Sequence, residues 1–401
     1  MKTTRLRYLL RPREVTNRTS LQVLSVYRDH GVIPKDSRSD NFNKTPEDIT
    51  RYQEVCVGDL VVNKMKAWQG SVGISAYHGI VSPDYLVCSV DASVDSRFMH
   101  HLLRSTRLAA EFGARSKGIR PAQWRLYWED LAEIPITLPS VDEQRRIADF
   151  LDGETARIDH TIELRQGSKS LIEEKTFATI AELATVGAGP IQTTNDPWIP
   201  VTGEGWDVVP LKRRWRIIDC KHRTPTYVEE GYPVISPGDI SPGRLDPSVA
   251  HRFVDEDDYR DLADHLRRAR CGDIVYGRNA SVGVAAFVDT DERFTMGQDV
   301  CRITSTNQDQ LFLTYFLNSA ALAQLGSVQI GSTFTRVNIG TLLEVSVACP
   351  PFEEQRRLAV EMDLISQRAM QLTSAIDRQL ALLAERRQAL ITAAVTGGIT
   401  V

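Results

Sequence analysis

The chain has 401 residues, 42% of them hydrophobic and 25% charged, and a formal net charge of -4, which is typical of a globular protein able to bury sizeable cores. It has no apolar run of about 18 residues and no apolar stretch near its N-terminus, so we expect a cytoplasmic protein. The six cysteines lack CxxC or Cys/His ligand spacing, which argues against a zinc site or a disulfide framework.

The charge is unevenly distributed along the chain. Residues 1–138 hold 20 basic and 15 acidic residues, whereas residues 188–348 hold 16 basic and 21 acidic residues. Local patches, and not totals, set the field that a phosphate backbone meets. The overall charge therefore neither requires nor excludes a nucleic-acid partner.

The chain contains an internal repeat. Residues 133–147 read EIPITLPSVDEQRRI, and residues 344–358 read EVSVACPPFEEQRRL. Upstream, the GDLV of residues 58–61 matches the GDIV of residues 272–275, and an SVG triplet occurs in both halves. The spacing between matches drifts by a few residues, as expected for two copies of one domain with different loops.

Each half predicts an α+β globule followed by one long helix. Short β-branched runs bounded by turns predict strands, and apolar residues at helical spacing predict a helix in each globule. The strands are expected at residues 59–63, 73–75, 85–90, 273–276 and 283–288, and the two globule helices at residues 96–112 and 309–325.

Helical patterns predict long helices at residues 139–187 and 353–396; the second contains no Gly or Pro, whereas Gly153 and Gly167 weaken the middle of the first. Each follows a proline and ends at glycines. Helices of this length exceed what a globule needs, so we expect them to pair as a coiled coil; the alternative is that each packs on its own globule. Chain order makes the pair antiparallel, which places Val401 near Met1 and relates the halves by a pseudo-twofold axis. The expected seam consists of Ile147, Leu151, Ile158, Ile162, Leu358, Met362, Ile365, Leu372, Ile376 and Leu383.

Several motifs in this order resemble the specificity (S) subunits of type I restriction-modification systems. In the first half these are residues 21–33, 58–70 and 79–85, and in the second half residues 218–227, 231–235 and 238–240. The prolines followed by an acidic pair and Gln-Arg-Arg are similar to the heads of the family's spacer helices. The family often has Gly where this chain has Cys220 or Arg223, so base contacts are not transferred there.

The resemblance implies two target recognition domains, at residues 1–138 and 206–348, with spacer helices at residues 139–187 and 349–401 and a linker at residues 188–205. It implies a non-catalytic subunit that reads a bipartite double-stranded DNA target. Two adenine methyltransferase subunits, and restriction and translocase subunits through them, are the implied partners in bacterial defence. S-adenosylmethionine, ATP and magnesium are implied only for those partners, in agreement with the missing methyltransferase tetrad, dinucleotide fingerprint and phosphate loop.

Two stretches of the first domain are candidates for DNA contact. Lysine and arginine neutralise phosphates, and Asn or Gln pairs bidentately with adenine. The first stretch offers Asn63, Lys64, Lys66 and Gln69. The second is a basic loop around Gly118 that offers Arg115, Lys117, Arg120, Gln123 and Arg125; the alternative is a solvated basic surface.

The second domain offers weaker candidates, which are Lys221, His222, Arg223, Thr224, Arg278, Asn279, Ser332, Thr333, Arg336 and Asn338. The acidic run at residues 255–264 is interpreted as a solvated face pointing away from DNA. It lacks the spacing of a calcium loop, and no catalytic or metal site is expected. The alternative functions are a coiled-coil scaffold whose globules bind protein and a stand-alone DNA-modifying enzyme.

Overall fold

The computed structural model describes residues 2–28, 30–37, 44–120, 123–279, 283–327 and 337–401. The chain divides into two compact units, each treated separately below. Unit 1 comprises Met1–Gln166 and Asp377–Val401, and unit 2 comprises Gly167–Ile376. Within the described ranges, no helix combines the length and the apolar character that crossing a membrane requires.

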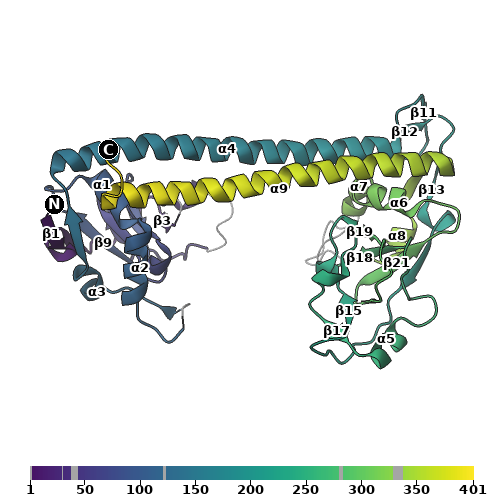
Figure 1. Ribbon diagram of the computed structural model, residues 1–401, viewed down its shortest axis with the longest axis horizontal. Coiled ribbons are helices and arrows are strands. Elements are labelled where there is room, and N and C mark those ends of the chain that lie inside the picture. Colours follow the sequence, from purple (N-terminus) through teal and green to yellow (C-terminus); the bar gives the residue numbers. More distant parts are fainter. Residues whose placement is uncertain (1, 29, 38–43, 121–122, 280–282, 328–336) are drawn as a thin grey trace. The chain divides into compact units, whose positions relative to one another are not determined.

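Unit 1 is built on a four-stranded antiparallel sheet of order β2-β9-β6-β7; Figure 1 labels β9 of this sheet. Its strands are β2 (Leu10–Pro12), β6 (Leu60–Asn63), β7 (Val72–Ile74) and β9 (Tyr85–Val90). Three two-stranded ladders surround it: β1 (Lys2–Arg5) with β10 (Pro135–Leu138), β3 (Leu24–Tyr27) with β4 (Gly31–Pro34), and β5 (Gln53–Val55) with β8 (Gly79–Val81). The three strands predicted in this half are confirmed.

The single helix predicted at residues 96–112 is in fact two helices, α1 (Ser96–Leu103) and α2 (Thr106–Arg115). Ser105 causes the break, because its hydroxyl donates to the carbonyl oxygen of Leu102 and accepts from the backbone N–H of Leu108. A serine at this position ends one helix and caps the next. A short third helix, α3 (Trp128–Ala132), follows.

Unit 2 is built on a five-stranded sheet of order β14-β21-β18-β19-β16. Its strands are β14 (Arg216–Asp219), β16 (Gly243–Arg244), β18 (Ile274–Gly277), β19 (Val284–Phe287) and β21 (Val300–Thr304). The remaining strands are β13 (Asp207–Pro210) paired with β22 (Ser346–Cys349), β15 (Tyr232–Ile235) between β17 (Phe253–Val254) and β20 (Thr295–Met296), and β11 (Ile191–Thr193) paired with β12 (Val201–Gly203). Both strands predicted in this half are confirmed.

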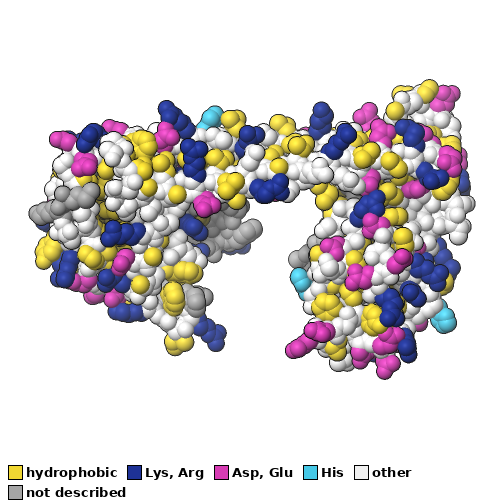
Figure 2. Space-filling model, in the orientation of Figure 1, with side chains coloured by type: hydrophobic (Ala, Val, Ile, Leu, Met, Phe, Trp, Pro, Cys, Tyr) yellow, Lys and Arg dark blue, Asp and Glu magenta, His cyan; other side chains and the backbone are white. Residues whose placement is uncertain are grey.

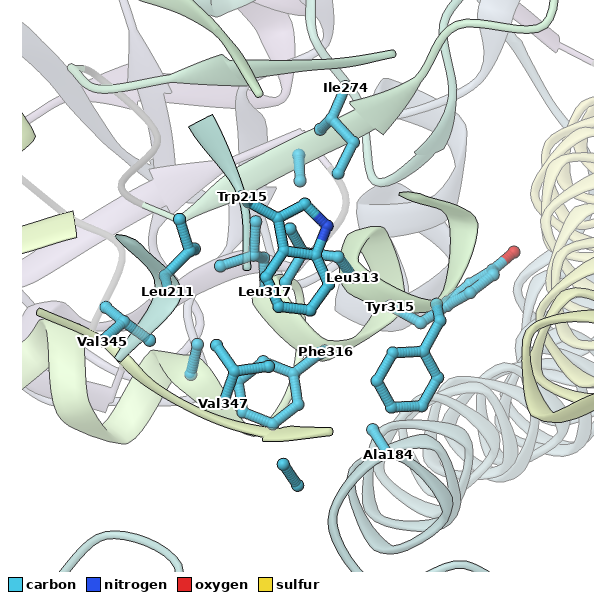
Figure 3. Close-up of a cluster of buried hydrophobic side chains, with 14 of the residues drawn as sticks. Ala184, Leu211, Trp215, Ile274, Leu313, Tyr315, Phe316, Leu317, Val345 and Val347 are labelled. Atoms are coloured by element: carbon cyan, nitrogen blue, oxygen red, sulfur yellow. The ribbon is translucent and has the colours of Figure 1, made fainter. Parts of the chain in front are cut away.

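The helices of unit 2 are α5 (Glu256–Leu262), α6 (Gln310–Leu317), α7 (Ala321–Ser327) and α8 (Ile339–Leu343). Here too the one helix predicted at residues 309–325 is two, because α6 ends at Asn318, whose amide side chain binds the backbone of Ala285 in β19. The core of this unit packs Trp215, Phe316 and Leu317 between the sheet and the helices (Figure 3).

The two long helices are confirmed as α4 (Val141–Thr185) and α9 (Phe352–Thr396). In unit 1 the beginning of α4 shares a core with the end of α9, through Leu151 and Ala394 among others. In unit 2 the end of α4 shares a core with the beginning of α9, through Leu183 and Met362. The helices are therefore antiparallel within each unit. Val401 packs on the core of unit 1, while Met1 lies outside the described residues.

The seam between the long helices is partly different from the predicted one. Four residues of the predicted seam are buried in the cores of the globules instead: Ile147, Leu151, Leu358 and Met362. Two are buried as predicted, Ile158 and Ile376. Ile162, Ile365 and Leu383 are only half-buried. Leu372 was wrongly placed, since it is 55% exposed. Residues 372 and 373 both lie about one turn before Ile376, and Thr373 takes the more buried position.

Candidate nucleic-acid interface

Unit 1 has an open cavity of about 660 Å³ beside the ends of β3 and β6. Three of the predicted contact residues, Asn63, Lys66 and Gln69, line it. Arg28 and Lys35 also line it, and so does Lys44. Such a concave surface lined by cations and amides suits a phosphate backbone and the edges of bases.

Sequence reasoning missed Arg28, Lys35 and Lys44. Arg28 lies in the turn between β3 and β4, and Lys35 follows β4 directly. The sequence signal that could have indicated these residues is a charged turn between two short apolar runs. This pattern predicts a hairpin, but it does not predict which face of a sheet the hairpin contacts. Only the packing of β3 beside β8 and β6 brings these cations next to Asn63.

Asn63 has a structural role in the loop after β6. Its side-chain oxygen accepts hydrogen bonds from the backbone N–H groups of Met65 (3.1 Å) and Lys66 (3.2 Å), which forms a tight turn. Lys64 donates from Nζ to the carbonyl oxygen of Pro83 at 2.8 Å. Lys66 and Gln69 remain exposed at the cavity. Of the four candidates, these two are therefore the best placed to meet a ligand.

The two predicted stretches of unit 1 lie side by side, although they are about 50 residues apart in the sequence. The backbone N–H of Leu126 donates to the carbonyl oxygen of Lys64 at 2.9 Å. The rings of Trp68 and Trp124 meet edge to face with centroids 5.6 Å apart. The basic loop thus stands on the turn that borders the cavity.

The basic loop is a hairpin whose two described arms are residues 117–120 and 123–125. Lys117 and Arg125 exchange two backbone hydrogen bonds, of 3.0 and 2.9 Å. Part of the charge is neutralised within the unit, because Arg115 pairs with Glu111, Lys117 with Asp130, and Arg125 approaches Asp84 at 3.5 Å. Arg120 is exposed and forms no ion pair with any residue in the described ranges. Gln123 is exposed as well.

Two candidates of unit 2, Lys221 and Arg223, are held in ion pairs. Lys221 contacts Asp261 at 2.5 Å, and Arg223 contacts Asp258 and Asp261, the latter at 2.9 Å. Hydrogen bonds from Arg223 and Lys221 lower the pKa of the Asp258 and Asp261 carboxyls respectively. The interpretation of the acidic run as a solvated face pointing away from DNA stays a prediction, but two of its carboxylates are paired with candidate cations. The carboxylates of α5 neutralise these cations directly.

Four further candidates of unit 2 have local structural roles. Arg278 is only 4% exposed, because its guanidinium donates to Asp219 at 2.8 Å and ties β18 to β14; a surface contact with DNA is thus excluded in this conformation. His222 also contacts Asp219, at 3.0 Å. Asn279 donates to Asp299, and Thr224 accepts from Gln298.

Asn338 caps α8, since its side-chain oxygen accepts from the backbone N–H of Thr341 at 2.8 Å. A capping role explains an Asn at this position without a ligand. The neighbouring candidates Ser332, Thr333 and Arg336 lie outside the described residues.

Two groups bring together atoms that are able to ligate a metal within 4.8 Å of one another: Glu54, Cys56 and His78 in unit 1, and Asp219, Cys220 and His222 in unit 2. In each group an arginine already supplies a cation. Arg13 donates to Cys56 Sγ at 2.8 Å and to Glu54 at 3.0 Å, and Arg278 donates to Asp219. Burial also raises the pKa of the Cys220 thiol, which disfavours the thiolate that a metal requires.

Residues 207–381 match the family model described as the type I restriction modification DNA specificity domain. Among solved structures, a chain from a study of complex assembly and conformational transition in the type I R-M system has a TM-score of 0.72 at 20% identity. The alignment covers 98% of this chain and 97% of that one. The HsdS subunit from Thermoanaerobacter tengcongensis has a TM-score of 0.50 at 19% identity, with 99% and 97% covered.

Proposed function

We propose that this protein reads DNA with both of its units. The premise is that residues 207–381 match the type I restriction modification DNA specificity domain and that the chain has the fold of HsdS subunits. The family model covers only the second half of the chain. The extension to unit 1 rests on one observation, which is a hydrogen-bond network that recurs in both units.

The recurring network lies where each long helix begins. In unit 1 the side chain of Gln144 accepts from the backbone N–H of Asp95 and donates to the carbonyl oxygen of Pro139. In unit 2 Gln355 makes the same two bonds, at 2.9 Å and 2.8 Å, to Asp309 and Pro350. Both glutamines are buried, and both aspartates cap the helix that follows.

The order of the elements also recurs. The order β2-β9-β6-β7 in unit 1 corresponds, strand by strand along the chain, to β14-β21-β18-β19 in unit 2. In each unit the strand just before this sheet, β1 or β13, pairs with the strand just before a long helix, β10 or β22. These correspondences support a duplication in which each unit is a target recognition domain. The target is then bipartite, with one half-site for each unit.

On unit 1, the candidate DNA surface consists of the cavity and the basic hairpin. This surface carries Arg28, Lys35, Lys66 and Arg120, with Gln69 as a candidate for base contact. In unit 2 the ion pairs of Lys221 and Arg223 with α5 leave a less basic surface. Its contribution is expected to depend more on hydrogen bonds and shape than on phosphate neutralisation.

The partners we propose are two methyltransferase subunits that dock on the long helices. Several large apolar side chains of these helices are exposed, and such side chains are candidates for contact with a docked subunit. They are Leu164, Leu171 and Phe177 on α4, and Val360, Leu364, Met370, Leu372 and Leu382 on α9. The chain itself is proposed to be non-catalytic, with S-adenosylmethionine, ATP and magnesium bound by the partners.

Binding of the full chain to random duplex DNA over a salt series tests this function. Because Arg120 is exposed and unpaired among the described residues, Arg120→Ala should weaken binding to all sequences and reduce the slope of log affinity against log salt by about one. Arg145→Ala on α4, which removes an exposed cation outside the candidate surface, is the matched control and should leave the slope unchanged. A wild-type chain that binds no duplex DNA, alone or with its methyltransferase partner, contradicts the proposal and favours a protein-binding scaffold.

A further inference from the structure

The basic hairpin of unit 1 carries an isoleucine two residues beyond Lys117, in its first described arm. Ile119 is 94% exposed, the highest value among the large apolar side chains that the structure describes. It stands between Gly118 and Arg120 in the sequence. Figure 2 shows hydrophobic and basic side chains close together on the part of unit 1 that lies beyond α2 in Figure 1. Isolated exposed apolar residues are common on protein surfaces, so the exposure matters only together with the geometry of the hairpin.

The hairpin is braced at its base. The two backbone hydrogen bonds between Lys117 and Arg125 join its arms, and Trp124 packs against Trp68. Gly118 allows the close approach of the arms, because a Cβ atom there would lie 2.6 Å from the carbonyl oxygen of Gln123. Ile119 therefore follows a fixed base and is not packed against the core of the unit in this conformation.

The surroundings of Ile119 favour DNA as the surface that covers it. Arg120 is adjacent and exposed, and Lys117 and Arg125 stand behind it. An exposed apolar side chain next to an exposed arginine suits a duplex, in which phosphates line the grooves and base faces are the apolar surface within reach. Proteins that bend DNA insert Phe, Leu, Ile, Met or Pro between base pairs in this way.

We propose that Ile119 is a wedge that inserts between two stacked base pairs of the half-site read by unit 1 and kinks the duplex there. Arg120 contacts a phosphate beside the kink and holds Ile119 in the groove. Unstacking is easiest at pyrimidine-purine steps, so unit 1 selects such a step without a hydrogen bond to it. Ile119 is then a specificity-determining residue. This inference rests on the proposed DNA-reading function and adds its mode of readout.

Selection of binding sites from a pool of random duplexes by the full chain, with its methyltransferase partner, tests the wedge. Wild-type protein should prefer a TA or CA/TG step at one position by about tenfold, the size of a typical single-position effect. Ile119→Ala should reduce that preference to below about twofold and keep the bases selected elsewhere. End-labelled duplexes carrying the selected site should show energy transfer that is higher with wild-type protein than with Ile119→Ala.

Control variants distinguish the wedge from a general loss of apolar surface and from a loss of the fold. Val57→Ala removes methyl groups from another exposed β-branched residue of unit 1 and should behave as wild type. Ile119→Leu should retain both the step preference and the bend. Because Ile119 is exposed, Ile119→Ala should unfold at the wild-type temperature, which excludes loss of the fold as the cause.

Three outcomes have distinct meanings. If Ile119→Ala selects the same step and bends DNA equally, the wedge is overturned. If the affected position is a single thymine, and deoxyuridine at that position reproduces the loss, Ile119 contacts a thymine methyl group and the wedge is again overturned. If the wild-type chain selects no sequence at all, the DNA-reading function itself fails.

Discussion

At the scale of single residues, His100 in α1 shows how packing suppresses a charge. Its Nδ1 lies 3.2 Å from the backbone nitrogen of Ile74, and its Nε2 lies 2.8 Å from Nη1 of Arg104. The backbone N–H of Ile74 donates to Nδ1, so a proton added to Nδ1 would face that donor. Burial, followed by the positive charge of Arg104, lowers the pKa of His100 to about 3. The neutral imidazole is therefore part of the packing of α1 on β7.

This depressed pKa predicts that unit 1 loses stability in mild acid. The unfolded chain takes up the proton near pH 6.5 and the folded chain only near pH 3, so the stabilisation is complete above about pH 6.5 and is lost as the pH falls below it. Between pH 7 and pH 5 the free energy of unfolding should fall by about 1–2 kcal/mol through this group. Denaturant titrations of wild-type protein at the two pH values measure the change.

His100→Gln should remove that part of the pH dependence, because glutamine does not titrate. His160→Gln on α4, where the histidine is exposed, is the control and should behave as wild type. An equal loss of stability between pH 7 and pH 5 in wild type and His100→Gln would show that the pKa of His100 is not depressed in the folded chain.

The predicted contact residues differ in exposure and bonding, because some lie next to a carboxylate or a backbone group and others do not. Arg120 and Lys66 are exposed, whereas Arg278 is buried against Asp219 and Asn338 caps α8. Residue type and local spacing are the same for a surface arginine and for a buried one. The difference arises from the end of β14, more than 50 residues away in sequence, which reaches Arg278 only in the folded unit.

At the scale of single elements, α9 combines a buried stripe with exposed apolar residues. Leu358 and Met362 are fully buried in the core of unit 2, whereas Val360, Leu364 and Leu372 are exposed. An apolar pattern with steps of three and four predicted the helix correctly but did not decide between neighbouring positions. Residues 372 and 373 both fit the stripe, and in the folded unit Thr373 is more buried than Leu372.

The exposure of Leu372 predicts that Leu372→Asp leaves the fold intact. The free energy of unfolding should change by less than about 0.5 kcal/mol, as for other exposed positions. Met362→Asp, at a position with no exposed surface, should instead cost about 3–5 kcal/mol because an unpaired charge enters the core. Circular dichroism during thermal unfolding distinguishes the two variants.

If methyltransferase subunits dock on α9, Leu372→Asp should also weaken their binding in sedimentation or co-purification. Gln371→Asp adds the same charge at a neighbouring exposed position without removing an apolar side chain, so it is the matched control. Unfolding of Leu372→Asp as severe as that of Met362→Asp would mean that the seam runs through Leu372.

At the scale of the whole molecule, α4 and α9 both begin in one unit and end in the other. In unit 1 the pair is joined by a bidentate contact of Arg387 with Asp159, at 2.8 and 3.1 Å. A change in helix length near Ala181, at the end of α4, would disturb the core, because the neighbouring Ile180 and Leu183 are buried. A residue inserted there would turn core side chains outward. Gln166 on α4 and Gln379 on α9 are exposed and are better positions for a change in helix length.

Four helix-forming residues inserted after Gln166 and another four after Gln379 should lengthen both helices together. Each helix gains about 6 Å and a rotation of about 40°. If the helices set the separation of the half-sites, methylation mapping should find the same half-sites with a spacer longer by about one to two base pairs. Substitution of Gln166 and Gln379 by alanine, without insertion, is the control. An unchanged spacer would show that the helices do not measure the distance.

The sequence by itself determined the α+β class, the repeat, three strands of one central sheet and two of the other, and the two long helices, because these depend on patterns within short stretches or on similarity between two stretches. The tertiary structure decided which cations are free. Lys221 and Arg223 pair with carboxylates some 35–40 residues away, and the turn at Asn63 meets the hairpin at Trp124 only after the sheet has formed. Charge pairing and burial act between residues that are distant in the chain, so no local pattern in the sequence contains them.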